Sequence, residues 1–435
     1  MKKQYHWGYA VVAATTLLSL LIWIGSMWYF DEWYDEPFTY VAKVGSMGAT
    51  TLICWTFILS TRFSVVERLF GGLDKVYKAH RHIGQTAFFL ILLHPLFLAV
   101  RLLPEWQEFL RFFWFSDDWV RNSGIIALLL FFVLVSVSLW ISLRYHVWKQ
   151  THHFFGLVLI VVIVHMIVAN AEIMTFPVLR VWFFAWLAIA VLCYIYIRLL
   201  YRWIGPLYDY EVVATTERGD IIEISLKPVR PRRHLKHRPG QFIYISFDTE
   251  TVSAEPHPFS ISSPPEEPHL RISVKELGDW TSGLDSLQGG ERARIWGPYG
   301  KFGDNLAADP DLDPVLIAGG IGLTPFLSMI NDDQLMHETD RTIYLIYSVE
   351  TPDEAIYHDD IESLHLDPER FVYVPHSSDD DGFLDATTIA DKVGGLDGKT
   401  FLICGPAPMM ESIADDLKKH GVGIERIATE DFSVI

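Results

Sequence analysis

Cysteine is scarce in this 435-residue sequence, which contains only three. Cys54 and Cys193 lie in apolar runs and Cys404 lies in a more polar segment. This spacing excludes a disulfide framework and a cysteine-rich metal site. Positive charge is also in short supply, because 35 lysines and arginines stand against 53 aspartates and glutamates, for a net charge of -18. A nucleic-acid partner is therefore not expected, since phosphate binding needs a basic surface.

Apolar residues are plentiful but unevenly distributed. They make up 50% of the chain and concentrate in its first half, before residue 205. Six stretches there supply roughly 17 to 25 apolar residues each, enough to cross about 30 Å of hydrocarbon. We expect membrane helices, with lipid as their partner, at approximately 8–30, 44–61, 83–103, 123–143, 154–171 and 178–201. The first run is too long for a signal peptide and lacks a small-residue cleavage site.

Charges in the short connections predict the orientation of these helices. Basic residues fall on one side: Lys2, Lys3, Arg62, Arg68, Lys75, Lys78, Arg81, Arg144, Lys149 and Arg202. Acidic residues fall on the other: Asp31, Glu32, Asp35, Glu36, Glu105, Glu108, Asp117, Asp118 and Glu172. By the positive-inside rule, a multi-pass protein of the cell membrane with both termini in the cytoplasm is expected.

Histidines lie inside two of the predicted membrane helices, where an ionisable residue marks a functional site by default. The third helix carries His80 and His94, and the fifth carries His152, His153 and His165. Two imidazoles on one iron give a closed, electron-transferring haem. Because the third and fifth helices run in the same direction, His80 and His152 can meet near one face of the membrane. His94 and His165 can then meet near the other.

The spacing of these histidines tests the two-haem hypothesis. The 14 residues from His80 to His94 return to nearly the same helix face about 21 Å along the axis. On an ideal helix, the direction of the His165 side chain differs by roughly 140° from that of His152 and by about 120° from that of His153. Helix geometry alone therefore leaves both residues open as the partner of His80. No Cys-x-x-Cys-His motif is present, so the haems would be of the non-covalent b type. The alternative is that the histidines only line a polar bundle interior.

The second half of the sequence changes to short alternating strands, which predict a small antiparallel barrel. Within it lies the run His257-Pro258-Phe259-Ser260-Ile261-Ser262-Ser263. This run resembles the flavin-binding signature of the ferredoxin-NADP reductase superfamily, in the form typical of NADPH oxidases and ferric reductases. The resemblance implies FAD contacts from His257, Pro258, Phe259, Ser260 and Ser262.

A second flavin element follows, in which Lys275 precedes the run Gly278-Asp279-Trp280-Thr281. It resembles the family segment that contacts the FAD pyrophosphate, which implies roles for Lys275, Gly278, Trp280 and Thr281. Further on, Gly297-Pro298-Tyr299-Gly300 is expected to be a turn that closes the barrel.

From about residue 313, strands alternate with helices, which predicts a parallel α/β sheet. A buried strand leads into Gly319-Gly320-Ile321-Gly322-Leu323-Thr324-Pro325, a glycine turn before a helix, which suits a pyrophosphate. With Cys404-Gly405-Pro406 after a later strand, these residues resemble the nicotinamide site of the same superfamily. The C-terminal Glu430-Asp431-Phe432 resembles its last motif, in which the aromatic covers the flavin. Catalytic positions are thus implied for Cys404 and Phe432.

The coenzyme preference depends on Glu350, which follows the predicted strand 344–349. Family members that select NADPH often carry arginine there for the 2'-phosphate. A carboxylate would repel that phosphate and accept a hydrogen bond from a free ribose hydroxyl. NADH is favoured, NADPH stays open, and Glu350 is alternatively a solvent-facing residue without a cofactor contact.

Nearly the whole chain resembles the NADPH oxidase and ferric reductase family. The expected domains are a six-helix di-haem domain at 1–205, an FAD-binding barrel at 206–308 and an NAD(P)H-binding α/β domain at 309–435. The family's ligand spacing selects His152 over His153. It implies an oxidoreductase in which electrons pass from NAD(P)H to FAD, to an inner haem on His80 and His152, and to an outer haem on His94 and His165.

The electron acceptor stays open at this stage. Oxygen, reduced to superoxide, is the first expectation, although Leu98 replaces a histidine found in animal superoxide-producing members. Ferric or cupric ions, attracted by the acidic outer loops, are the second. A periplasmic protein or quinone partner is the third. No calcium-binding EF-hand loop or segment for a cytosolic activator is visible, so constitutive activity is expected.

Overall fold

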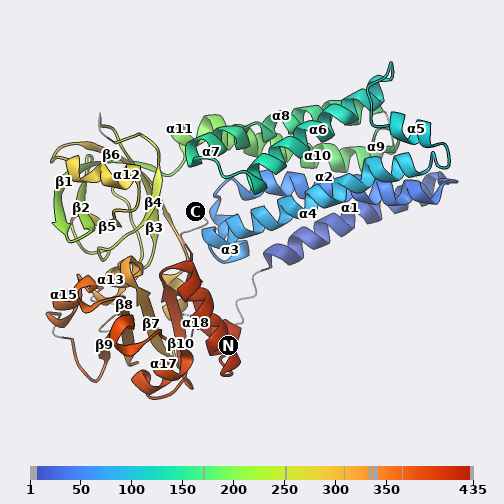
Figure 1. Ribbon diagram of the computed structural model, residues 1–435. Coiled ribbons are helices and arrows are strands. Elements are labelled where there is room, and N and C mark those ends of the chain that lie inside the picture. Colours follow the sequence, from blue (N-terminus) through green and yellow to red (C-terminus); the bar gives the residue numbers. More distant parts are fainter. Residues whose placement is uncertain are drawn as a thin grey trace. The chain divides into compact units, whose positions relative to one another are not determined.

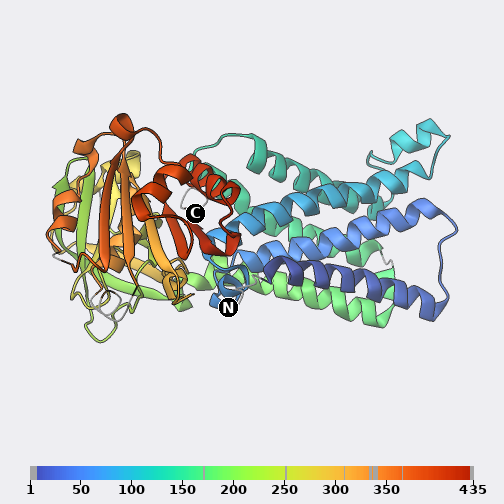
Figure 2. The same ribbon diagram turned by 90° about the horizontal axis from the view of Figure 1, so that it is seen from below.

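The computed structural model describes residues 7–169, 172–249, 252–307, 309–332, 336, 341–364 and 366–431. The chain divides into two compact units. The helical unit comprises residues 6–70 and 75–201, and nearly all of the other unit comes from residues 202–435. Figures 1 and 2 show the helices of the first and the two sheets of the second.

Six helical segments of the described chain are long and apolar enough to cross a membrane. They are α1 (Gly8–Phe30), α2 (Pro37–Leu59), α4 (Leu73–Val100), α6 (Trp119–Trp140), α7 (Tyr145–His153) with α8 (Phe155–Ala169), and α10 (Pro177–Ile195) with the π-helix η1 (Tyr196–Leu200). Short helices connect them, namely α3 (Ser64–Phe70), α5 (Trp106–Arg111) and α9 (Glu172–Thr175). Figure 1 shows α5 and α9 at one end of the bundle and α3 and α7 at the other. The predicted number of spans is confirmed, although the second and third begin earlier than expected, at Pro37 and Leu73. This is a multi-pass membrane protein.

Polar contacts as well as apolar packing hold these helices together. Trp23, Met27 and Phe183 are buried in one core cluster of the bundle. Ser19 on α1 accepts hydrogen bonds from Thr51 on α2 and from the indole of Trp182 on α10, both at 2.9 Å. Hydrogen bonds of this kind stabilise helix contacts in lipid, where apolar burial contributes little.

The fifth span is interrupted between the predicted histidine ligands. The amide of Phe154 donates to the carbonyl of Thr151 and the amide of Leu157 to that of Phe154, a tight i to i−3 pattern. Each residue of such a turn rotates about 120° instead of 100°. The extra rotation reduces the angular offset between His152 and His165. The distortion that the ideal-helix spacing required is therefore present at Phe154.

A curled antiparallel sheet opens the second unit. Its strands are β1 (Leu207–Arg218), β2 (Ile221–Pro228), β3 (Phe242–Phe247), β4 (His257–Ser260), β5 (Leu270–Lys275) and β6 (Arg292–Tyr299), in the order β4-β3-β6-β1-β2-β5. A bridge between Ile261 and Ile272 connects the two edges of the sheet. The predicted turn at 297–300 is wrong, because Gly297 to Tyr299 belong to β6 and Tyr299 pairs with Phe242 on β3.

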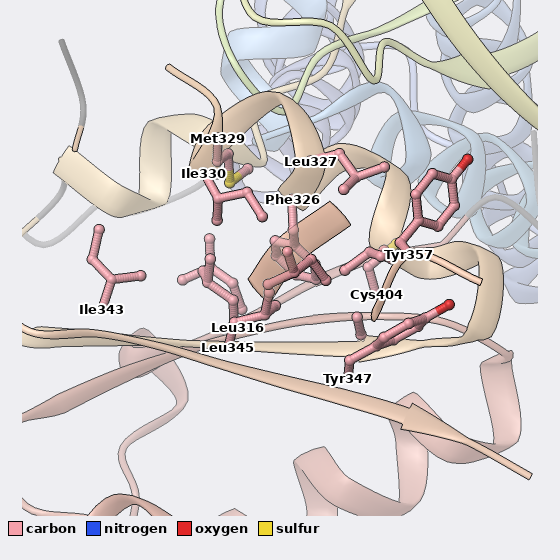
Figure 3. Packing of buried hydrophobic residues seen from close by; sticks show 14 of the residues in the cluster. Leu316, Phe326, Leu327, Met329, Ile330, Ile343, Leu345, Tyr347, Tyr357 and Cys404 are labelled. Atoms are coloured by element: carbon pink, nitrogen blue, oxygen red, sulfur yellow. The ribbon is translucent and has the colours of Figure 1, made fainter. Parts of the chain in front are cut away.

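A five-stranded parallel sheet follows, in the order β11-β10-β7-β8-β9. The strands are β7 (Asp313–Gly319), β8 (Ile343–Val349), β9 (Phe371–Ser377), β10 (Lys399–Cys404) and β11 (Ile427–Glu430). The helices include α13 (Thr324–Ile330), α15 (His358–Glu362), α16 (Ser378–Asp381), α17 (Ala386–Val393) and α18 (Ala407–Lys419). Figure 3 shows side chains of α13 packed on Leu316 of β7 and Leu345 of β8. The predicted fold class is confirmed in both sheets.

Candidate functional site

Two histidines from different helices face each other near one end of the bundle. The imidazoles of His80 on α4 and His152 on α7 have ring centres 5.9 Å apart. An imidazole nitrogen binds a metal at about 2 Å, so two rings on opposite sides of one iron have centres about 6 Å apart. Trp148 stacks on His152 at 5.0 Å and Phe155 lies at 4.8 Å, which encloses this ring in aromatic surface.

The second predicted pair, His94 on α4 and His165 on α8, lies further along the same two membrane spans. His165 packs against α6, where Gly124 leaves room for it: a β-carbon at Gly124 would lie 3.0 Å from the imidazole Cε1. Glycine here is thus explained by the histidine that it accommodates.

Each of the four imidazoles uses its Nδ1 in a hydrogen bond to a neighbouring helix. The Nδ1 of His80 lies 3.0 Å from the carbonyl oxygen of Thr56, and that of His94 lies 3.1 Å from the carbonyl oxygen of Ala42, both on α2. A carbonyl only accepts, so both rings carry their proton on Nδ1 and present Nε2. This arrangement is typical of metal-ligating histidines, whose other nitrogen is held by a second group.

The remaining two rings are held by serines of α6. The Oγ of Ser123 lies 2.9 Å from Nδ1 of His165, and the Oγ of Ser138 lies 3.3 Å from Nδ1 of His152. The hydroxyl of Ser123 donates to the carbonyl of Val120, so its oxygen accepts from the imidazole. His165 therefore also presents Nε2.

The geometry fits haem iron better than a bare metal ion. Among the described residues, no group of three or more His, Cys, Asp or Glu side chains is arranged to hold a metal. Haem needs only two axial protein ligands, because the porphyrin occupies the other positions. The facing imidazoles of His80 and His152 meet that requirement.

Two further histidines of these helices, His153 and His82, point elsewhere. The Nε2 of His153 lies 3.1 Å from a guanidinium nitrogen of Arg198 on η1, and its backbone carbonyl accepts from Tyr194. His82 is exposed, and its Nδ1 lies 3.2 Å from the hydroxyl of Tyr9. Helix geometry left open whether His152 or His153 pairs with His80. In the structure, the ring that faces His80 is that of His152.

A charged cluster adjoins the second histidine pair. Lys43 follows Ala42 on α2, and its Nζ lies 2.5 Å from a carboxylate oxygen of Glu172 on α9. The hydroxyl of Tyr34 also donates to Glu172. Burial alone would raise the pKa of Glu172, but Lys43 and these hydrogen bonds lower the pKa below its usual range. The carboxylate of Glu172 is thus charged at neutral pH.

The predicted flavin residues gather around one tryptophan. His257, Pro258, Phe259 and Ser260 form β4. Trp280 stacks on Phe259 with ring centres 5.7 Å apart and lies 4.2 Å from the ring of His257. Ser262 is buried and accepts a hydrogen bond from Ser273, so it fixes the chain between β4 and β5.

The segment after β5 forms a compact turn. The hydroxyl of Thr281 accepts hydrogen bonds from the amides of Leu277 and Gly278 at 2.9 and 3.0 Å. A β-carbon at Gly278 would meet no protein atom within 4 Å. Packing within the protein therefore does not require glycine here, which agrees with a partner outside the protein. Lys275 forms an ion pair with Asp220 at 2.8 Å.

Glycines bring two loops of the parallel sheet into contact. A β-carbon at Gly322 would collide with the carbonyl of Cys404, and one at Gly405 would lie 3.0 Å from the Cα of Gly319. These three glycines allow the turns after β7 and β10 to touch at one edge of the sheet. Gly320 differs, because it has φ +53° and a β-carbon there would face open space.

The remaining predicted nucleotide residues occupy the same edge. Thr324 and Pro325 begin α13, and the hydroxyl of Thr324 donates to the carbonyl of Ile321. Pro406 precedes α18. Glu350 follows β8 with an exposed side chain, while its backbone carbonyl accepts from the hydroxyl of Ser377 and the amide of Asp379.

Cys404 ends β10 and is buried in the packing cluster of Figure 3. Burial, reinforced by Glu430 and Asp431, raises the pKa of the Cys404 thiol well above its usual range. The thiol therefore stays protonated at physiological pH and is not a ready nucleophile. Phe432 lies outside the described residues.

Three family models match successive stretches of the chain. The model for the ferric reductase like transmembrane component matches residues 44–163, that for an FAD-binding domain matches residues 210–301, and that for an oxidoreductase NAD-binding domain matches residues 316–415. The chain thus joins a ferric-reductase-like transmembrane domain to an FAD-binding and an NAD-binding domain. The FAD-binding and NAD-binding domains predicted from the motifs are thereby confirmed.

Characterised relatives match about half of this fusion protein. The ferredoxin reductase component of 3-ketosteroid-9-alpha-monooxygenase from Mycobacterium tuberculosis is 27% identical over 232 residues, which cover 51% of this chain and 63% of that protein. The flavohemoprotein of Oceanobacillus iheyensis is 27% identical over 242 residues, which cover 52% of this chain and 58% of that protein. The chain therefore spans less than two thirds of either relative.

A flavohemoglobin from Malassezia yamatoensis, solved with bound FAD and heme, is similar in fold to the fusion protein. It has a TM-score of 0.50 at 18% identity over 90% of this chain and 96% of that one. At this identity the similarity concerns the fold alone.

Sequence reasoning did not find the groups that hold the histidines. Ser123, Ser138 and the carbonyls of Ala42 and Thr56 lie in apolar helices without any motif. One signal was present: Ala42 and Thr56 are 14 residues apart, the same separation as His80 and His94. Lys43, a lone cation in an apolar run, was a second signal.

Proposed function

We propose that this protein is an oxidoreductase that carries electrons from NADH or NADPH across a membrane through FAD and two b-type haems. Four histidines carry this proposal: the rings of His80 and His152 face each other, and each of the four rings has its Nδ1 engaged by a neighbouring helix. The three domain matches supply the donor side. Bound FAD converts a hydride into single electrons, and bis-histidine haems pass on one electron each.

The residues of this chain have distinct roles in the proposed path. His80 with His152 and His94 with His165 would hold the two irons, one towards each face of the membrane. Their backbone and serine partners on α2 and α6 fix the ring orientation before any cofactor binds, which lowers the reorganisation needed during electron transfer.

The donor side has its own set of residues. The β4 residues and the turn at 278–281 would hold the flavin, with Trp280 and Phe259 as aromatic surface. The glycine turns after β7 and β10 would hold the nicotinamide nucleotide beside it. Cys404, protonated and buried, would pack beneath this site instead of acting as a base or nucleophile.

The dehydrogenase domains and both chain ends would face the cytoplasm. The excess of lysine and arginine in the connections on that side supports this orientation. Electrons would then leave from the outer pair, His94 and His165. We propose oxygen, reduced to superoxide, as the acceptor, because the outer pair is closed to further ligands and favours transfer without bonding to iron. Ferric or cupric ions are the second candidate, supported by the acidic connections on the outer side.

Optical spectroscopy of the purified protein tests the core of the proposal. A dithionite-reduced spectrum of low-spin b-type haem is expected, and its absence would refute the di-haem site. Steady-state reduction of an external dye by NADH with added FAD tests the acceptor. Superoxide dismutase should suppress this reduction if oxygen is the acceptor. An unaffected rate, together with faster turnover on ferric citrate, would favour the metal reductase.

A further inference from the structure

The connection between α4 and α6, residues 101–119, is unusually aromatic for a loop. It contains Trp106, Phe109, Phe112, Phe113, Trp114, Phe115 and Trp119. Trp114 is 71% exposed, Trp106 64% and Trp119 73%, within the part of the chain that the structure describes. We propose that this segment lies in the headgroup region of the bilayer and anchors the outer end of the bundle to lipid.

The segment is ordered although its large side chains are exposed. The amide of Ser116 donates to Asn122, whose side-chain amide donates back to the carbonyl of Ser116. The Asp118 carboxylate accepts from the amide of Val120 and caps α6. Ring contacts run from Trp106 to Phe109 and on to Phe113, each at 5.7 Å. Trp106 is therefore held by neighbouring rings within an ordered segment.

The backbone of this segment is suited to a region with little water. Amides of residues 102, 103, 105, 109, 112, 113 and 114 donate to carbonyls three or four residues earlier. Unsatisfied backbone groups are costly near hydrocarbon, so a loop that bonds internally can enter the interface. Short helical turns provide these internal hydrogen bonds without a long helix.

Polar and apolar side chains of α5 lie on different faces. Trp106, Phe109 and Leu110 follow helical spacing on one face, while Gln107, Glu108 and Arg111 occupy the other. Glu108 and Arg111 form an exposed ion pair at 3.2 Å on the polar face. Such a division is typical of segments that lie in the membrane surface with their rings pointing inward.

The position of the segment along the membrane normal indicates that lipid is its partner. It joins the ends of two membrane helices, on which Leu96 of α4 and Ile126 of α6 are also exposed. Because spans alternate in direction, the end of α1 reaches the same face of the membrane. There Trp28, Tyr29 and Trp33 are also exposed. Tryptophan and tyrosine concentrate at this level of membrane proteins, where they form a belt.

Spin labels at single introduced cysteines test the location in full-length protein reconstituted in phosphatidylcholine nanodiscs. The native Cys54, Cys193 and Cys404 are buried, so labelling will be selective. Labels at W106C and W114C should collide more often with oxygen, which concentrates in lipid, than with a water-soluble nickel complex. Matched labels at Q107C and D117C, in the same segment, should show the reverse. L110C replaces either tryptophan variant that fails to fold.

Two results would overturn the proposal. A preference for nickel at residues 106, 110 and 114 would place the rings in water. Low collision rates with both reagents would place them beneath protein, either a second copy of this chain or a different partner, and cross-linking at the same cysteines would separate these cases. Neither result would bear on the haem proposal, which has its own optical test.

Discussion

The imidazole of His80 faces that of His152 with 5.9 Å between ring centres, and each ring is held through Nδ1 by a different helix. The two neighbours in sequence, His152 and His153, therefore have opposite surroundings. One faces another histidine, and the other lies beside the guanidinium of Arg198.

Replacement of either ring tests this difference. The His152→Ala variant should lose about half of the haem absorbance of the wild-type protein, because one of two irons loses an axial ligand. The matched His153→Ala variant should retain nearly all of it. Haem per protein, measured by pyridine haemochrome absorbance, checks both. Equal losses in the two variants would contradict the assignment.

The serines of α6 should control how firmly the cofactor is held. Ser123→Ala removes the acceptor of the His165 Nδ1–H, and loss of such a second group typically costs about 10- to 100-fold in metal affinity. Ser136→Ala is the control, because its hydroxyl on the same helix has no described partner. Haem retention during dilution and the midpoint potential of the outer haem are the measurements. The prediction fails if Ser123→Ala and Ser136→Ala behave alike.

Coenzyme choice should respond to the residue after β8. Glu350→Arg should raise kcat/KM for NADPH relative to NADH by about tenfold, the equivalent of about 1.4 kcal/mol, because it replaces a repulsive charge with an attractive one. Glu350→Gln should have a smaller effect in the same direction. Initial rates with both coenzymes at fixed ionic strength measure it. An unchanged ratio in both variants would show that Glu350 does not contact the nucleotide.

The ion pair between Lys43 and Glu172 should make stability depend on acid pH. Because the folded-state pKa of Glu172 is lowered, its contribution is present above the unfolded pKa of about 4.3 and is lost as pH falls through the folded value. Lys43→Met should lower stability by about 3 kcal/mol at neutral pH, as expected when one partner of a buried pair is removed. It should also reverse this acid dependence, because burial without Lys43 raises the pKa of Glu172. Apparent melting temperatures between pH 3 and pH 7 provide the check.

An ionic cluster joins the two sheets of the second unit. Arg218 at the end of β1 binds Glu223 on β2 at 3.1 Å and also Asp360 on α15, while Tyr357 donates to Glu223. Arg218→Ala should cost about 1 kcal/mol and raise KM for NADH, since the proposed nucleotide site lies beside the proposed flavin site of the other domain. The control is Lys227→Ala, which breaks an ion pair within the antiparallel sheet alone. Equal KM values in the two variants would argue against a role in domain positioning.

Much of the architecture was readable from periodicity and short motifs. Six long apolar runs predicted six spans, because hydrocarbon thickness sets helix length. Strand alternation and glycine turns predicted that an antiparallel sheet is followed along the chain by a parallel one. The turn expected at 297–300 was wrong, because glycine and proline at the end of a strand carry the same local signal as in a turn.

What the sequence alone determined is which residues can do chemistry: four histidines in apolar helices, a flavin motif and a nucleotide motif, each set by residue type and spacing. Only the tertiary structure decided how those residues are oriented. It turned His152 towards His80 and His153 towards Arg198, placed Ser123 and Ser138 against two of the rings, and buried Cys404. The physical reason is that ring direction depends on the local tightening at Phe154 and on contacts with α2 and α6, which no spacing within a single helix encodes.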